Sequence, residues 1–101
     1  MTLEPFDKWD MDFIGPIDPP SRQKNYTIVC TDYLTKWVET KDVKVVTEEK
    51  VDELLRDNVF YKFGYPRELV TDKGSQFTSH LIDNVLRQHK VKHMKSNSYH
   101  P

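Results

Sequence analysis

The sequence has little of what marks a secreted or membrane-anchored protein. Its single cysteine, Cys30, cannot form an internal disulfide, and the apolar run around it predicts a buried, reduced thiol. No run approaches the ~20 apolar residues of a membrane-spanning helix. The N-terminus also lacks the basic and apolar regions of a signal peptide. These absences indicate an intracellular protein that does not contact a membrane.

Charge of either sign is also not in excess. The chain has 15 Lys and Arg against 16 Asp and Glu, a net charge of -1, so any nucleic-acid binding must depend on local groups. A hydrophobic fraction of 37% with 12% aromatic residues predicts a packed core. With 101 residues, we expect a single domain spanning 1–101.

Acidic residues are scarce in the last third of the chain, where residues 73–101 contain only Asp83. Two earlier aspartates stand out because their neighbours are apolar: Asp12 in Trp-Asp-Met-Asp-Phe-Ile and Asp72 in Leu-Val-Thr-Asp-Lys-Gly. An ionised carboxylate in such surroundings is costly without a partner. Two such acids converging on one sheet edge suggest a divalent-metal site.

The hydrophobic periodicity predicts an α/β fold in the order βββαβαβ. Thr47 is a suitable N-cap for the first helix, and Gly64 and Pro66 favour its end. The first three strands are expected to form an antiparallel meander. We expect strands at 9–14, 26–31, 36–40, 68–71 and 91–94, and helices at 47–63 and from Thr78 or Ser79 to His89.

Several polar residues have a plainer interpretation than metal binding. Asp10 shares a strand face with Asp12 and is expected to support the site or cap the strand start. Asp32 precedes a turn and should form hydrogen bonds within the hairpin. Asp83 lies on a polar helix stripe and is expected in solvent, and the histidines show no zinc spacing. The large aromatic residues are expected in the core: Trp9, Trp37, Phe60, Phe63 and Phe77.

Five runs, in this order, carry a family resemblance. They are FDKWDMDFIGP (6–16), TDYLTKWVE (31–39), FGYPRE (63–68), TDKGSQFT (71–78) and YHP (99–101). At these residues the chain resembles the catalytic core of retroviral and retrotransposon integrases. It is most similar to long-terminal-repeat retrotransposons of the gypsy class, with a plant as one possible source.

The resemblance implies a ribonuclease-H-like fold with a mixed five-stranded sheet and flanking helices. It also implies an active site of three carboxylates that hold two Mg²⁺ or Mn²⁺ ions. Asp12 matches the first carboxylate and Asp72 the second, as catalytic and metal-binding residues. The third is a glutamate beyond the Tyr-His-Pro motif, outside these 101 residues. We therefore expect a C-terminally truncated core, without its last helices and inactive or nearly so as this fragment.

The reaction implied is DNA 3′-end processing followed by strand transfer, in which paired ions stabilise the entering and leaving oxygens. The implied partners are double-stranded DNA, from element ends and target, and further copies in a homo-oligomer. For a eukaryotic element the nucleus is the expected location.

DNA contacts are expected from Lys73, Gln76, Lys92 and Lys95. Lys73 stands where the family often has asparagine, so it could contact phosphate or compete with a cation. The basic run that includes Lys92 and Lys95 could equally be a solvated helix end whose cations suit the helix dipole.

Two other functions remain open. One is a non-catalytic module, derived from an integrase, that binds DNA or another protein through a sheet face left uncovered. The other is a metal-dependent nuclease of the same fold, although its motifs differ around the first strand.

Overall fold

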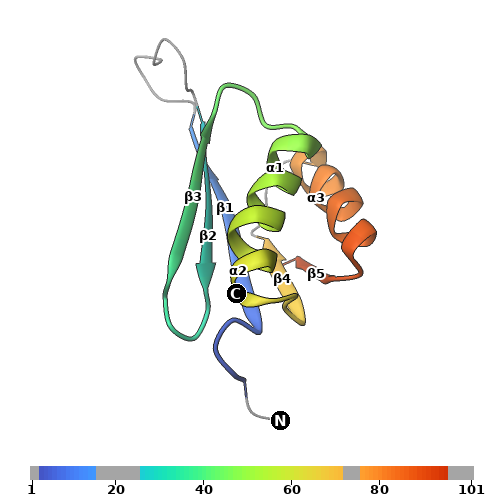
Figure 1. Ribbon diagram of the computed structural model, residues 1–101. Helices are drawn as coiled ribbons and strands as arrows, with labels where there is room; N and C mark the ends of the chain where they lie inside the picture. Colours follow the sequence, from blue (N-terminus) through green and yellow to red (C-terminus); the bar gives the residue numbers. More distant parts are fainter. Residues whose placement is uncertain (1–2, 16–25, 72–75, 96–101) are drawn as a thin grey trace, which may run out of the picture.

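The computed structural model describes residues 3–15, 26–71 and 76–95. These residues form one five-stranded sheet with its described helices on one face (Figure 1). The strand order is β3-β2-β1-β4-β5; β1, β2 and β3 run antiparallel, whereas β4 and β5 run parallel to β1. The predicted mixed sheet and opening meander are confirmed. The strands are β1 Lys8–Ile14, β2 Tyr26–Asp32, β3 Val38–Val43, β4 Glu68–Thr71 and β5 Lys92–Lys95.

One continuous helical stretch crosses the sheet between β3 and β4. It consists of α1 (Glu48–Leu54), a π-helical segment η1 (Leu55–Phe60) and α2 (Tyr61–Phe63). The Thr47 hydroxyl accepts a hydrogen bond from the Lys50 N–H at 3.2 Å, the N-cap expected from the sequence. The helix ends at Gly64, whose φ of 87° suits a residue without a Cβ. The predicted helix is confirmed.

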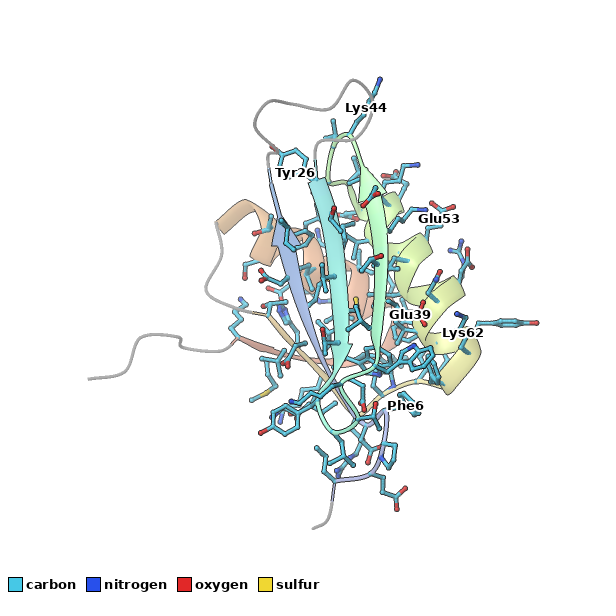
Figure 2. All side chains as sticks on the ribbon, turned by 90° about the vertical axis from the view of Figure 1, so that its left-hand side faces the viewer. Phe6, Tyr26, Glu39, Lys44, Glu53 and Lys62 are labelled. Carbon is cyan, nitrogen blue, oxygen red and sulfur yellow. The ribbon has the colours of Figure 1, made fainter. Side chains whose placement is uncertain are left out.

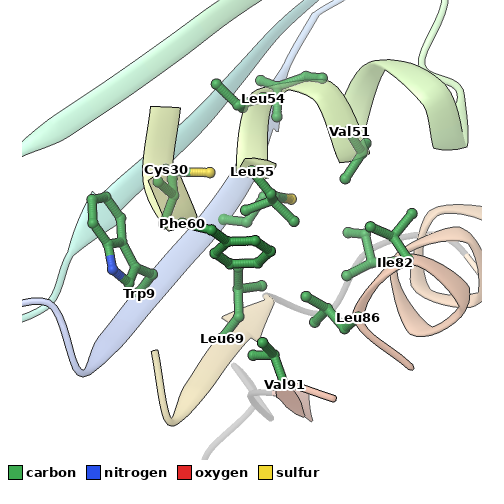
Figure 3. Close-up of a cluster of buried hydrophobic side chains, with 14 of the residues drawn as sticks. Trp9, Cys30, Val51, Leu54, Leu55, Phe60, Leu69, Ile82, Leu86 and Val91 are labelled. Carbon is green, nitrogen blue, oxygen red and sulfur yellow. The ribbon is translucent and has the colours of Figure 1, made fainter. Parts of the chain in front are cut away.

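The π-helical segment adjusts which side chains face the sheet. A wider turn lets Leu55 and Phe60, five positions apart, both be buried, together with Val59. In Figure 3, Phe60 lies between Trp9 and Cys30 of the sheet and Ile82 and Leu86 of the second helix. Burying each such side chain contributes on the order of 2 kcal/mol.

The second helix, α3, spans Gln76–His89 and starts earlier than expected from Thr78 or Ser79 as its N-cap. Its apolar stripe is buried as expected, and Cys30 is a buried free thiol. Among the described residues, no helix is long and apolar enough to cross a membrane. The stripe consists of Leu81, Ile82, Val85 and Leu86.

The third strand was expected at 36–40, but β3 begins only at Val38. Residues 33–37 form the connection instead, because the Lys36 N–H bonds to the Asp32 carbonyl at 2.9 Å and Lys36 adopts φ of 69°. The prediction that Trp37 is a core residue is wrong, since its side chain is 52% exposed. The last strand, expected at 91–94, is likewise displaced by one residue, to Lys92–Lys95.

The Asp32 carboxylate organises the end of this hairpin. It is fully buried, and it accepts hydrogen bonds from the Thr35 N–H at 2.7 Å and the Phe6 N–H at 2.9 Å. The predicted hairpin role is confirmed. The bond to Phe6 adds a long-range link that fixes the segment before β1.

Glu39 connects β3 to the helical layer. Its buried carboxylate accepts hydrogen bonds from Trp37 Nε1 at 2.6 Å, Asn58 Nδ2 at 3.0 Å and Lys62 Nζ at 3.3 Å. Glu39 and Lys62 lie next to each other in Figure 2. Burial raises the pKa of Glu39, but the three hydrogen bonds and the Lys62 charge outweigh it, so the pKa is lowered.

Replacing Asp32 tests the hairpin link. Asp32→Ala leaves two backbone N–H groups without their acceptor, so the free energy of unfolding should fall by ~2–4 kcal/mol in urea titrations. Asp42→Ala is the matched control, because Asp42 is exposed and accepts only from Thr27 among the described residues. Its loss should stay below ~1 kcal/mol. Equal losses for the two variants would contradict the role given to Asp32.

Glu39 makes stability depend on pH. Because its folded pKa is lowered, its contribution is fully present above the usual glutamate pKa of about 4.3 and is lost as the pH falls through the folded value. Glu39→Gln should therefore cost ~1–2 kcal/mol at pH 7 and distinctly less in acid, measured by urea unfolding across pH. Glu53→Gln, at an exposed ion pair with Lys41, serves as control and should show little pH dependence. A Glu39→Gln cost that does not change with pH would sink this account.

Candidate active site

The carboxyl end of β4 lies beside the middle of β1 at the proposed site. The two strands are parallel, and Met11 is paired with Thr71. Asp12 follows Met11 in the chain, as Asp72 follows Thr71. Asp72 lies outside the described residues, so its expected role stays a prediction.

Asp12 presents its carboxylate on the sheet face that the helices leave open. Trp9 and Met11 are buried toward the helices, and alternation along β1 places Asp10 and Asp12 on the opposite face. The Asp12 side chain is exposed, and its Oδ1 accepts a hydrogen bond from the Phe13 N–H at 2.8 Å. No other partner of this carboxylate is found in the described part of the chain.

Asp10 has a different environment on the same face. It is partly buried, and burial is the main cause that raises its pKa; the charges of Lys8 and Lys36 lower it, and Asp32 raises it further. The nearby lysines lie at the amino end of β1, away from Asp12. The lysine charges that act on Asp10 thus lie at the amino end of the strand. Its expected role in supporting the site stays a prediction.

The two DNA-binding candidates on β5 lie at opposite ends of that strand. Lys73 lies outside the described residues, and Gln76 is the first residue of α3, with a side chain that is not described. Lys95 is paired with Thr71 at the carboxyl end of the strands, whereas Lys92 is paired with Glu68 at the amino end. Of the two candidates on β5, Lys95 therefore lies nearer the candidate site than Lys92.

The basic run near the end of the chain is divided by internal partners. His89 Nε2 lies 2.5 Å from Asp52 Oδ1, and Lys95 Nζ lies 3.1 Å from Asp83 Oδ2. Arg87, Lys90 and Lys92 remain exposed. The cations available for phosphate contact are fewer than the sequence suggests.

The prediction that Asp83 lies in solvent is wrong. Its side chain is 26% exposed and contacts His93 Nδ1 as well as Lys95. His93 Nε2 in turn lies 2.7 Å from Thr71 Oγ1. The available signal was His93 itself, two residues after the apolar Val91 and so on the same, inward face of the last strand.

A divalent cation fits the chemistry of Asp12. Hard cations prefer oxygen ligands, and Asp12 offers a carboxylate oxygen that no described side chain engages. Among the described residues, no three His, Cys, Asp or Glu side chains form a group that could hold a metal. The described part of the site thus supplies one ligand.

The chain is similar to known proteins over nearly its whole length. Residues 3–101 match the family described as integrase core domain. The chain is 31% identical over 97 residues to the uncharacterized protein K02A2.6 of Caenorhabditis elegans, covering 96% of this chain and 7% of that protein. It is 32% identical over 98 residues to a Pro-Pol polyprotein of feline foamy virus, covering 97% and 8%. The chain thus spans less than a tenth of the length of these relatives.

A solved structure of similar fold is an intasome of simian T-cell lymphotropic virus in complex with the PP2A regulatory subunit B56 gamma. The TM-score is 0.73 at 17% identity, over 97% of this chain and 37% of that one. At this identity the likeness concerns the fold, which is the ribonuclease-H-like α/β fold of integrases. With nearly every residue matched by the family, the chain belongs to the integrase core domain family.

Proposed function

We propose that this chain forms part of a metal-dependent DNA integration site, with Asp12 and Asp72 as its first two carboxylates. The observation that carries the proposal is the Asp12 carboxylate. It is exposed on β1, one residue beyond Met11, the partner of the last residue of β4, and only the Phe13 N–H engages it in the described part of the chain. A carboxylate oxygen that no described side chain engages is available for a ligand.

Asp12 would hold Mg²⁺ or Mn²⁺ through the oxygen that does not accept from the Phe13 N–H. That backbone bond restricts rotation of the carboxylate and so orients the remaining oxygen. When bound, paired divalent ions stabilise the entering and leaving oxygens at phosphorus. Asp72, one residue beyond β4, is the second ligand of the proposal.

The substrate in this proposal is double-stranded DNA, both the element end and the target. Lys95, at the carboxyl end of β5 and paired with Asp83, is the described DNA-binding candidate next to the end of β4, with Lys73 and Gln76 as further candidates. We also propose a homo-oligomer and a nuclear location. The motif runs support a gypsy-class element as the source, with a plant as one candidate host.

The third carboxylate of the family is not among these 101 residues. We therefore expect this chain by itself to bind metal without trimming a DNA 3′ end. Magnesium-dependent trimming by the 101-residue chain would overturn this part of the proposal.

Metal binding gives the most direct test. Mn²⁺ affinity, measured by calorimetry at pH 7, should fall by ~10-fold or more in Asp12→Asn and in Asp72→Asn, because each variant loses a charged ligand. Asp42→Asn is the matched control, since Asp42 is an exposed acid on the same open sheet face. Its affinity should equal that of the parent chain. Unchanged affinity in Asp12→Asn would refute Asp12 as a ligand.

A second candidate function is a non-catalytic binding module, favoured by apolar side chains on the open face. Ile14, Val38 and Met94 are 56%, 49% and 38% exposed on the face without helices. Exposed apolar surface of this kind favours self-association or a partner.

Self-association through the open face tests the second candidate. If the open face is a binding surface, light scattering should show dimers or larger species at micromolar concentration, and Val38→Lys should shift them toward monomer. Lys44→Glu, a charge change at an exposed residue just beyond β3, is the control and should leave the distribution unchanged. A parent chain that stays monomeric would count against the module.

A further inference from the structure

Three side chains from three elements are joined at the carboxyl end of β4. Thr71 on β4 contacts His93 on β5 at 2.7 Å between Oγ1 and Nε2, and His93 Nδ1 contacts Asp83 Oδ1 on α3. Thr71 is 5% exposed and the His93 side chain 6%. The contacts are therefore shielded from competing water, and losing one partner leaves a buried polar group unsatisfied.

The donor and the acceptor in each of these hydrogen bonds can be assigned. The hydrogen bond from His93 lowers the pKa of Asp83, burial opposes it, and Lys95 lowers it further. An ionised carboxylate can only accept, so the proton between the two residues belongs to His93 Nδ1. In the neutral ring Nε2 is then an acceptor, and the Thr71 hydroxyl donates to it.

The same residue types form nucleophilic triads elsewhere, but this geometry does not serve that purpose. The Thr71 hydroxyl is buried and faces the imidazole on the helix-covered side of the sheet. Thr71 is 5% exposed, so little of it is open to a substrate. The role we infer for these contacts is to hold β4 in position against β5 and α3.

That position matters because of the strand register. Thr71 is paired with Met11 on one side and with Lys95 on the other. Asp12 and Asp72 are the next residues after Met11 and Thr71 in the sequence. Fixing Thr71 therefore fixes the strand backbone that lies one residue before Asp72 in the sequence and beside Met11, one residue before Asp12.

We propose that Asp83 and His93 act, through Thr71, as positioning residues for the metal site of the proposed function. They hold the carboxyl end of β4 against β5 and α3, so that the two carboxylates converge. The inference rests on that proposed function. Groups behind the ligands of a metal commonly set ligand orientation, and losing them weakens metal affinity by roughly 10–100-fold.

Asp83 and Asn84 are neighbours on α3 and provide a matched pair for mutagenesis. Thr71→Val and Asp83→Ala should each lower Mn²⁺ affinity by about 10-fold in calorimetry, because the end of β4 loses its anchor. Asn84→Ala is the control, since Asn84 Nδ2 donates to Glu48 Oε2 at 2.9 Å and ties α3 to α1 instead. It should lower stability yet leave Mn²⁺ affinity unchanged. Thr71→Ser keeps the hydroxyl and should restore most of the affinity.

A spectroscopic measurement without metal makes the proposal testable even if a variant fails to fold. Nitrogen-detected NMR of the parent chain should show the His93 ring proton on Nδ1, and Asp83→Asn should weaken this tautomer preference. A neutral His93 ring with its proton on Nε2 instead of Nδ1 in the parent chain would overturn the arrangement.

The outcomes also separate this inference from the proposed function. If Asp12→Asn lowers Mn²⁺ affinity but Thr71→Val and Asp83→Ala do not, the positioning role is wrong and the metal site stands. If Asp12→Asn has no effect, the metal site falls, and the positioning role falls with it.

Discussion

The pairing of β1 on both of its edges is the constraint on which the rest of the structure depends. β1 is antiparallel to β2 and parallel to β4, so it joins the opening hairpin to the α/β half of the sheet. Side chains alternate along a strand, and this register sends Trp9 and Met11 into the core and Asp12 to the open face. A slip of one residue would bury Asp12 and expose Trp9, which would remove core and site together.

Three carboxylates near this sheet differ in role because their surroundings differ. Asp32 is buried and accepts from two backbone N–H groups, so it fixes the hairpin. Glu39 is buried and accepts from three side chains, so it joins sheet to helix. Asp12 has one backbone donor among the described residues and faces solvent. The first two are committed to structure, and the third is available for a ligand.

The elements predicted well are those whose signal is local. The helix over 47–63 follows from its cap, its apolar spacing and the terminating glycine, all within one stretch of chain. The third strand was misplaced because the left-handed backbone of Lys36 lengthens the turn, which alternation alone does not reveal. Asp83 was misplaced because its partner His93, ten positions away, is brought to it only when β5 pairs with β4.

The sequence by itself determined the class and order of the elements and the family resemblance, since these depend on short-range pattern and motif; Asp12 as a site residue stays a prediction. Asp72, Lys73 and the Gln76 side chain rest on the sequence alone. Only the tertiary structure decided that the described helices all lie on one face of the sheet, that Glu39 is held by the helix, and that Thr71, His93 and Asp83 meet. Those contacts join residues distant in the chain, and their geometry is set by strand register and helix packing, which no local pattern encodes.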